Sequence, residues 1–79
     1  MTERVMNRWD LEAILNRELH KHSQCSACRF VGFDTWDGEG SIFDHVRVEC
    51  GDLSPSAYGE IVEKIVAGAK CTYEDVTVE

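Results

Sequence analysis

Proline occurs once in the 79 residues and glycine six times, which is too little of either for a collagen-like or disordered chain. Long hydrophobic runs are also missing, since no apolar stretch approaches the roughly 20 residues that a membrane span needs. Residues 1–8 have no apolar core of the kind that a signal peptide contains. We therefore expect a single domain over residues 1–79, located in the cytoplasm and without membrane contact.

Sequence motifs for catalysis or nucleotide binding are absent as well. There is no Walker A motif, no GxGxxG at the start of a helix, no HExxH and no GxSxG. The acidic stretch beginning at Asp34 lacks EF-hand spacing, because its twelfth position is His45. Asp37 and Glu39 lie at a predicted turn tip, where they are solvated and too loosely fixed for acid–base catalysis. We expect a protein that is not an enzyme.

Basic residues are scarce, with 8 Lys and Arg against 15 Asp and Glu, so the net charge is −7. The imbalance lies in residues 30–79, which hold eleven acidic and three basic side chains. Such a field disfavours direct binding to nucleic acid or anionic lipid and favours a basic partner. The alternative is that the acidity only keeps a small domain soluble.

Hydrophobic periodicity predicts a helix from about Asn7 to His22, with Leu11, Leu15 and Leu19 on its apolar side. Residues 28–36 are rich in β-forming types, and Ile42 to Cys50 alternate between apolar and polar side chains. With Asp-Gly at 37–38 between them, residues 28–50 are predicted to form a two-stranded hairpin. Ser54 before Pro55 is typical of a helix start. Residues 71–78 are predicted to form a last short strand.

This order of elements, α-β-β-α-β, predicts an α+β fold. We expect a three-stranded, mainly antiparallel sheet with strand order 2-1-3 and two helices on one face. The other face would be open to solvent or to a partner. Because an outer strand of so small a sheet is uncovered, a homodimer formed through the sheet edge is a further expectation.

The cysteines suggest a metal site. If the hairpin turns near Glu39, Cys28 lies opposite Cys50, and Cys25 and His22 (or His20) lie at the same end of the sheet. Three thiolates and one imidazole form a closed structural zinc set, so we consider one zinc ion held by His22, Cys25, Cys28 and Cys50. The alternatives are reduced thiols without metal, a cross-strand bridge between Cys28 and Cys50, and a thiol redox protein.

The predicted hairpin also concentrates acidic and aromatic residues. Along a strand, alternate side chains lie about 6.6 Å apart, which is similar in scale to the spacing of phosphates on a nucleic-acid strand. Carboxylates on such a hairpin could replace phosphates on a basic surface, and aromatic side chains could anchor the contact. The predicted partner-binding residues are Asp34, Trp36, Asp37, Glu39, Phe43, Asp44 and Glu49.

In size, charge and the acidic segment of residues 33–44, the chain resembles the small acidic inhibitors carried by phages and mobile elements. Anti-CRISPR proteins that imitate DNA belong to that group. The resemblance implies a non-enzymatic inhibitor that occupies the basic nucleic-acid-binding surface of a protein or nucleoprotein complex. The alternative function is a small adaptor protein stabilised by zinc.

Overall fold

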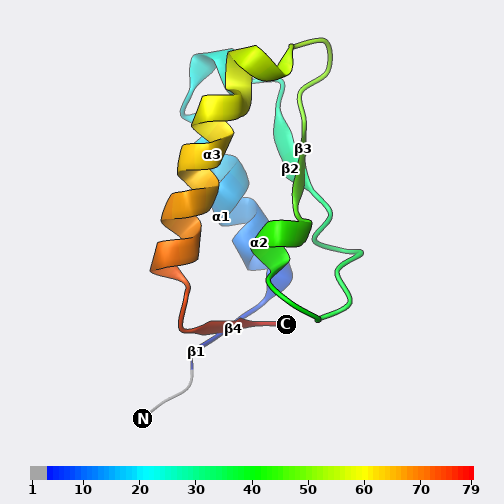
Figure 1. Cartoon of the computed structure of the whole chain (residues 1–79), viewed down its shortest axis with the longest axis vertical. Helices are drawn as coiled ribbons and strands as arrows, with labels where there is room; N and C mark the ends of the chain where they lie inside the picture. Colours follow the sequence, from blue (N-terminus) through cyan, green and yellow to red (C-terminus); the bar gives the residue numbers. More distant parts are fainter. Residues whose placement is uncertain (1–3) are drawn as a thin grey trace.

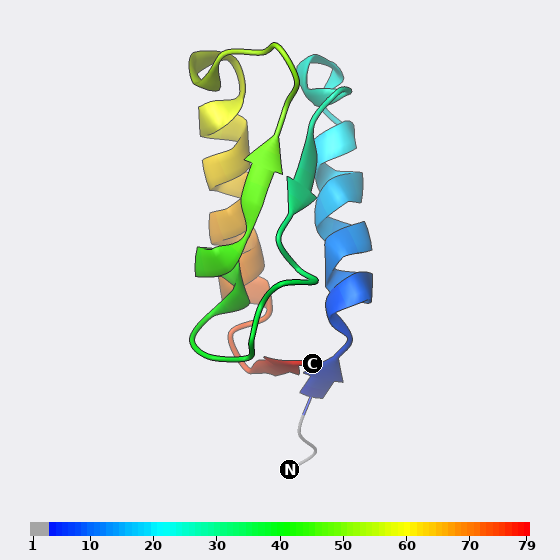
Figure 2. The ribbon, with the colours of Figure 1, turned by 90° about the vertical axis from the view of Figure 1, so that its right-hand side faces the viewer.

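The computed structural model of the protein describes residues 4–79, which form four short strands, two long helices and two short helical segments (Figure 1). The strands pair into two separate sheets: β1 with β4 in parallel, and β2 with β3 antiparallel. The β2–β3 hairpin lies over α1 and α3, and the β1–β4 pair closes one end of the molecule (Figure 2). In chain order the elements are β1 (Arg4–Met6), α1 (Arg8–His20), a 3-10 turn η1 (Ser23–Cys25), β2 (Arg29–Val31), α2 (Ile42–His45), β3 (Arg47–Glu49), α3 (Pro55–Thr72) and β4 (Val76–Val78).

Helix α1 forms where the periodicity predicts it. Asn7 caps its start, since the Asn7 side chain accepts a hydrogen bond of 2.7 Å from the backbone N–H of Trp9. Leu11, Leu15 and Leu19 follow each other every four residues and are at most 2% exposed. Burying each of these side chains contributes about 1.5–3 kcal/mol, so this stripe is the main apolar contribution of α1 to the core.

Helix α3 begins as predicted, with Ser54 as the N-cap residue and Pro55 in the first helical turn. It contributes less to the core than α1, because Ala69 is its single buried residue. Its other hydrophobic side chains are partly buried against the core, which leaves some of the apolar surface of α3 in contact with solvent. These side chains are Tyr58, Ile61, Val62, Ile65 and Val66.

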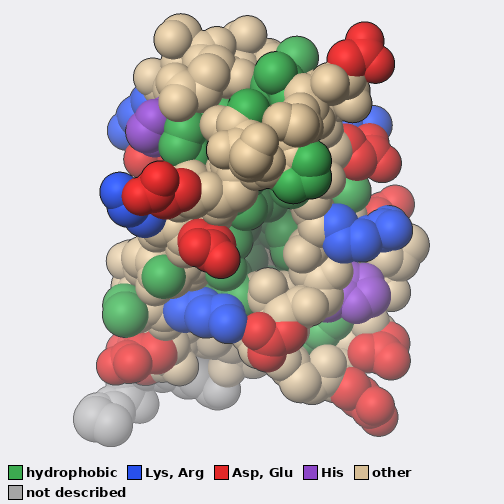
Figure 3. All heavy atoms as spheres, turned by 45° about the horizontal axis from the view of Figure 1, so that its top comes forward, with side chains coloured by type: hydrophobic (Ala, Val, Ile, Leu, Met, Phe, Trp, Pro, Cys, Tyr) green, Lys and Arg blue, Asp and Glu red, His purple; other side chains and the backbone are tan. Residues whose placement is uncertain are grey.

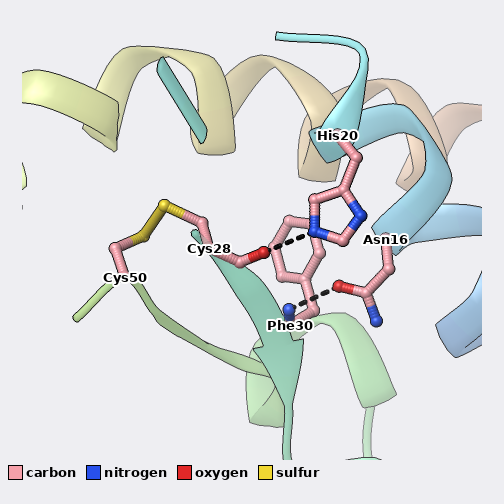
Figure 4. Close-up of a disulfide and its surroundings, with 5 residues drawn as sticks. All are labelled: Asn16, His20, Cys28, Phe30 and Cys50. Atoms are coloured by element: carbon pink, nitrogen blue, oxygen red, sulfur yellow. Dashed lines mark hydrogen bonds between the residues drawn. A yellow bond between two sulfur atoms is a disulfide. The ribbon is translucent and has the colours of Figure 1, made fainter. Parts of the chain in front are cut away.

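The hairpin has the register that the sequence predicts. Phe30 pairs with Val48, so Cys28 and Cys50 lie opposite each other just beyond the paired residues. These two cysteines form a disulfide, and both are buried, at 1% and 5% exposure (Figure 4). The cross-strand bridge, which was one of the alternatives left open by the sequence, is therefore the arrangement in the structure.

The outer edge of β2 is closed by side chains of α1. The Asn16 side-chain oxygen accepts a hydrogen bond of 2.7 Å from the backbone N–H of Phe30, and the His20 Nε2 donates to the carbonyl of Cys28 at 2.6 Å (Figure 4). Asn16 and His20 are four residues apart and therefore lie on the same face of the helix. They occupy backbone groups that a further strand would need.

The predicted three-stranded sheet of order 2-1-3 is wrong. β4 pairs with β1, a strand that we did not predict, and not with the hairpin. The physical reason is the closed edge of β2, where α1 takes the place of a third strand. Helix α3 adds to this, because its 18 residues span about 27 Å and carry the chain to the opposite end of the molecule.

All three predicted strands are also shorter than expected, and the first is reduced from residues 28–36 to Arg29–Val31. Residues 42–45 form the helix α2 and not the start of a strand, and the Ser41 hydroxyl caps this helix by accepting a 3.2 Å hydrogen bond from the N–H of Phe43. The predicted last strand, residues 71–78, is reduced to Val76–Val78 because α3 continues through Thr72. Of the predicted strand over residues 42–50, Arg47–Glu49 form β3, and Val46 and Cys50 lie directly before and after it.

Replacing Cys50 with serine should lower the free energy of unfolding by about 3 kcal/mol, because the disulfide spans a sequence separation of 22 and restricts the unfolded chain. Urea unfolding followed by circular dichroism measures this loss. Cys71→Ser is the matched control, since Cys71 is a free and exposed cysteine. Equal stability of the two variants under oxidising conditions would show that the bridge does not stabilise the fold.

Replacing Asn16 with alanine should cost about 1–3 kcal/mol of stability, because the buried Phe30 N–H would lose its acceptor. Asn16→Asp is the control, since it keeps an acceptor oxygen at the same position. Hydrogen exchange of the Phe30 amide should accelerate in the alanine variant and stay slow in the aspartate variant. Unchanged exchange in both variants would contradict a role for Asn16 in closing the strand edge.

Candidate functional site

The predicted acidic residues gather mainly on one loop. Residues 32–41, which we call the acidic loop, connect β2 to α2 and carry Asp34, Asp37 and Glu39. All three side chains are exposed. Within residues 4–79 none of the three forms an ion pair. The acidic loop therefore presents three unneutralised carboxylates to solvent.

The acidic loop is held in place from inside by Arg8 and Trp36. The Arg8 guanidinium donates hydrogen bonds from Nη1 to the carbonyls of Phe33 at 3.1 Å and Trp36 at 2.7 Å. The same guanidinium lies 5.2 Å from the centroid of the Trp36 ring, within range of a cation–π interaction. Trp36 is buried at 8% exposure, and its indole N–H donates to the carbonyl of Glu39 at 3.1 Å. Trp36 thus supports the loop from below and does not offer its ring to a partner.

Local turns complete the shape of the acidic loop. Gly32 has a φ of +103°, where a side chain would be strained and would meet the carbonyl of His45 at 3.4 Å. The Thr35 hydroxyl donates to the carbonyl of Gly32 at 3.2 Å, and the Asp37 Oδ1 accepts from the N–H of Glu39 at 3.0 Å. These bonds fix where the carboxylates lie relative to one another.

The other predicted contact residues lie outside the loop and are partly engaged. The Asp44 carboxylate is 2.8 Å from the Lys70 ammonium, and Glu49 is 3.5 Å from the Arg29 guanidinium. Both pairs are exposed, so each contributes little to stability and can exchange partners. Phe43 is half-buried against the core. Phe43 and Asp44 lie on α2, which follows the acidic loop, whereas Glu49 lies at the other end of the hairpin, opposite Arg29. Asp44 and Glu49 therefore add no unpaired charge to the loop.

A surface hollow of about 570 Å³ connects the acidic loop with the end of α3. Gly38 and Gly40 of the loop line it together with Asp44, Lys70 and Glu74. Glu74 is exposed and is a fourth carboxylate without an ion pair in the described part of the chain. The candidate site therefore consists of the acidic loop and Glu74.

The net charge of the protein arises outside its two long helices. Residues 8–21, which are α1 and its C-cap residue Lys21, contain three acidic and three basic side chains, and residues 55–72 of α3 contain two of each. The remaining segments hold ten acidic and three basic residues, which accounts for the whole charge of −7. A basic partner would therefore be attracted to the connecting segments and not to the helices.

The structure changes one argument made from the sequence. Asp34, Asp37 and Glu39 lie on a loop and not on a strand, so the regular spacing of about 6.6 Å between alternate strand residues does not apply to them. Any imitation of phosphates rests on the shape of the acidic loop instead.

The cysteines do not fit the predicted zinc site as the structure places them. Cys28 and Cys50 are joined to each other, and metal ligation requires free thiolates. Cys25 is buried and free, while His22 is exposed and contributes its carbonyl, which accepts a 2.9 Å hydrogen bond from the N–H of Cys25. Residues 4–79 contain no group of three or more His, Cys, Asp or Glu side chains that could hold a metal ion.

Sequence reasoning did not identify two residues of the site. Arg8 entered only the total count of basic residues, and nothing local indicated that it binds the carbonyls of residues 25 and 28 positions away. Glu74 was assigned to a strand. The position of Asn7 as a cap was the one available signal for Arg8, since it places Arg8 in the first turn of a helix whose N-terminus lies beside the acidic loop.

No protein-family model, curated protein or solved structure matches the chain significantly. Among the residues that the structure describes, no helix combines the length and hydrophobicity that crossing a bilayer requires.

Replacing Arg8 with alanine should loosen the acidic loop, because both hydrogen bonds to the carbonyls of Phe33 and Trp36 and the contact with the Trp36 ring would be lost. We expect a loss of about 1.5–3 kcal/mol in stability, the range for hydrogen bonds to a charged group. Amide exchange of residues 33–39 should also become faster. Arg17→Ala on the exposed side of α1 is the control, and identical exchange in the two variants would count against the role given to Arg8.

Proposed function

We propose that the protein is a non-enzymatic inhibitor that covers the basic, nucleic-acid-binding surface of a protein or nucleoprotein complex with its acidic loop. The observation that carries the proposal is the set of exposed carboxylates of Asp34, Asp37 and Glu39, which lack ion-pair partners in the described chain. A net charge of −7 supports it, since direct binding to nucleic acid would be opposed by repulsion.

In this mechanism the carboxylates of the acidic loop pair with Lys and Arg side chains of the partner. Lysines and arginines that bind phosphates also bind carboxylates, and Arg does so with two parallel hydrogen bonds. Because the same cations cannot hold both ligands, the inhibitor excludes DNA or RNA by competition. Charge complementarity also accelerates the encounter of the two proteins at low salt.

The internal bonds of the acidic loop favour this mechanism. A loop that is ordered before binding loses less conformational entropy when a partner is bound. Arg8 and the buried Trp36 provide that order, so they support affinity without touching the partner. The exposed ion pair of Asp44 with Lys70 can open to add a carboxylate, because such pairs are weak.

The proposal places the protein in the cytoplasm with its target. A cytoplasmic disulfide is uncommon because the compartment is reducing. Cys28 and Cys50 are 1% and 5% exposed, and this burial limits access of reducing thiols to the bridge. The acidic loop lies at the opposite end of β2, so its internal contacts do not include the disulfide (Figure 1).

The first test is a pull-down with the tagged protein from nuclease-treated bacterial lysate, in which bound proteins are eluted by stepwise increases in salt. In the second test, the DNA or RNA that the retained complex normally binds is added, to measure whether it displaces the protein from the complex. The triple variant Asp34→Asn, Asp37→Asn, Glu39→Gln should bind the complex about tenfold more weakly, since each exposed ion pair contributes about 0.5 kcal/mol. The concentration of this variant that displaces nucleic acid from the complex should rise by the same factor.

The matched control removes three carboxylates from the helices, as Glu12→Gln, Glu18→Gln and Glu63→Gln, and so has the same net charge. Equal loss of binding in both triple variants would mean that overall acidity, and not the acidic loop, attracts the partner. Retention that does not respond to salt, or binding that does not displace nucleic acid, would contradict the proposed mechanism.

A further inference from the structure

The two edges of the β2–β3 hairpin differ. The outer edge of β2 is bonded to Asn16 and His20 of α1, as described above. The outer edge of β3 has no such cover, because α3 packs mainly against α1 and η1 and not beside β3. Figure 1 looks onto this side of the molecule, where β3 and α3 face the viewer.

The open edge of β3 centres on Val48. In an antiparallel pair, opposite residues alternate between hydrogen-bonded and non-hydrogen-bonded positions. Since the N–H of Phe30 is bonded to Asn16, Phe30 and Val48 form a non-hydrogen-bonded pair. The N–H and C=O of Val48 therefore point away from β2. In the described chain no group bonds to either of them.

Of the outward-facing backbone groups of Val46 and Cys50, one on each residue is hydrogen-bonded within the chain and the other is not. The N–H of Val46 is bonded to the carbonyl of Ile42 at 3.0 Å, and the carbonyl of Cys50 accepts from the N–H of Leu53 at 3.1 Å. The carbonyl of Val46 and the N–H of Cys50 remain without a partner among the described residues. The edge thus offers a short set of donors and acceptors arranged symmetrically about Val48.

The side chains of β3 are complementary to a second copy of the same strand. If two β3 strands pair antiparallel with Val48 opposite Val48, Arg47 of each copy lies opposite Glu49 of the other. Arg47 is exposed and has no ion pair within residues 4–79, whereas Glu49 contacts Arg29 in its own copy. Opposite charges on directly opposed strand residues stabilise the pair.

The same register matches the free backbone groups. The two Val48 residues exchange two hydrogen bonds, and the Cys50 N–H of each copy reaches the Val46 carbonyl of the other. The groups left out, the Val46 N–H and the Cys50 carbonyl, are those already bonded within the chain. The free backbone groups and the side-chain charges therefore favour the same register, in which Val48 lies opposite Val48.

We propose that two copies of the chain pair through β3 around a two-fold axis at Val48, forming a continuous four-stranded sheet in the order β2-β3-β3-β2. This inference does not depend on the proposed function, because the acidic loop lies outside β3. It refines the general expectation of a dimer through a sheet edge by naming the strand, the register and the charged pairs.

The surface beside β3 is consistent with a second copy. Tyr58, Val62 and Val66 of α3 recur every four residues and are partly buried. They lie next to Ile61 and Ile65, which line the groove against α1. Figure 3 shows that the face between α3 and β3 is hollowed and that hydrophobic side chains line the hollow. Since α3 carries no net charge, two such faces can approach without net repulsion between the helices.

The test uses two charge reversals, Arg47→Glu and Glu49→Arg, in separate proteins. Sedimentation at about 0.15 M salt should show the unaltered chain at twice the 9.0 kDa mass of one copy. Each variant alone places like charges opposite each other at both paired positions, so its dimer should weaken by about tenfold or more. An equimolar mixture restores opposite charges at both positions and should return to the dimer mass.

The controls are Arg17→Glu and Glu18→Arg on α1, which change the charge by the same amounts. Glu18→Arg also removes an exposed ion pair, with Lys21, as Glu49→Arg removes the pair with Arg29. Both controls should sediment like the unaltered chain. Recovery in the mixture also shows that the two interface variants are folded.

Three outcomes would overturn the proposal. The first is an unaltered chain that stays monomeric at a concentration of about 0.5 mM, well above the range of a specific dimer. The second is a dimer that persists in each single variant, because the copies then meet through another surface. The third is a mixture that stays monomeric while the unaltered chain dimerises, which would exclude the register centred on Val48.

Discussion

The hydrogen bonds from Asn16 and His20 to the outer edge of β2 are the contacts on which the architecture depends. They satisfy backbone groups of a buried strand with helix side chains, and so end the hairpin sheet on that side. A third strand cannot enter there, and β4 pairs with β1 instead. The resulting difference between the two hairpin edges leaves β3 as the side at which the sheet can grow.

Helix α1 also connects this edge to the acidic loop. Its last turn carries His20, which binds β2, and its first turn carries Arg8, which binds the loop that follows β2. Between them, Leu11, Leu15 and Leu19 hold the helix in the core. One rigid helix thus sets both the position of the hairpin and the shape of the acidic loop, although the charges of the helix and its C-cap residue Lys21 cancel.

Local signals in the sequence predicted the parts of the fold that depend on neighbouring residues. The start of the first helix near Asn7, the Ser54-Pro55 helix start and the opposition of Cys28 and Cys50 were all correct. The errors concern distant contacts. β1 has three residues and is defined by a partner about 70 positions away, and Trp36 is buried because Arg8 and the loop fold around it. No periodicity or spacing encodes such contacts, so the site was located by its acidic residues while its internal support was not foreseen.

The pairing of β1 with β4 has a consequence for the order of folding. It brings Arg4 beside Val76, and the chain between them includes every other element. Closing so long a loop costs conformational entropy before any contact repays it, whereas the helices and the hairpin form over short sequence separations. We therefore expect the β1–β4 sheet to form last, on a scaffold of α1, α3 and the hairpin that is already assembled. The same sheet is then the unit whose opening leaves the rest of the native structure in place.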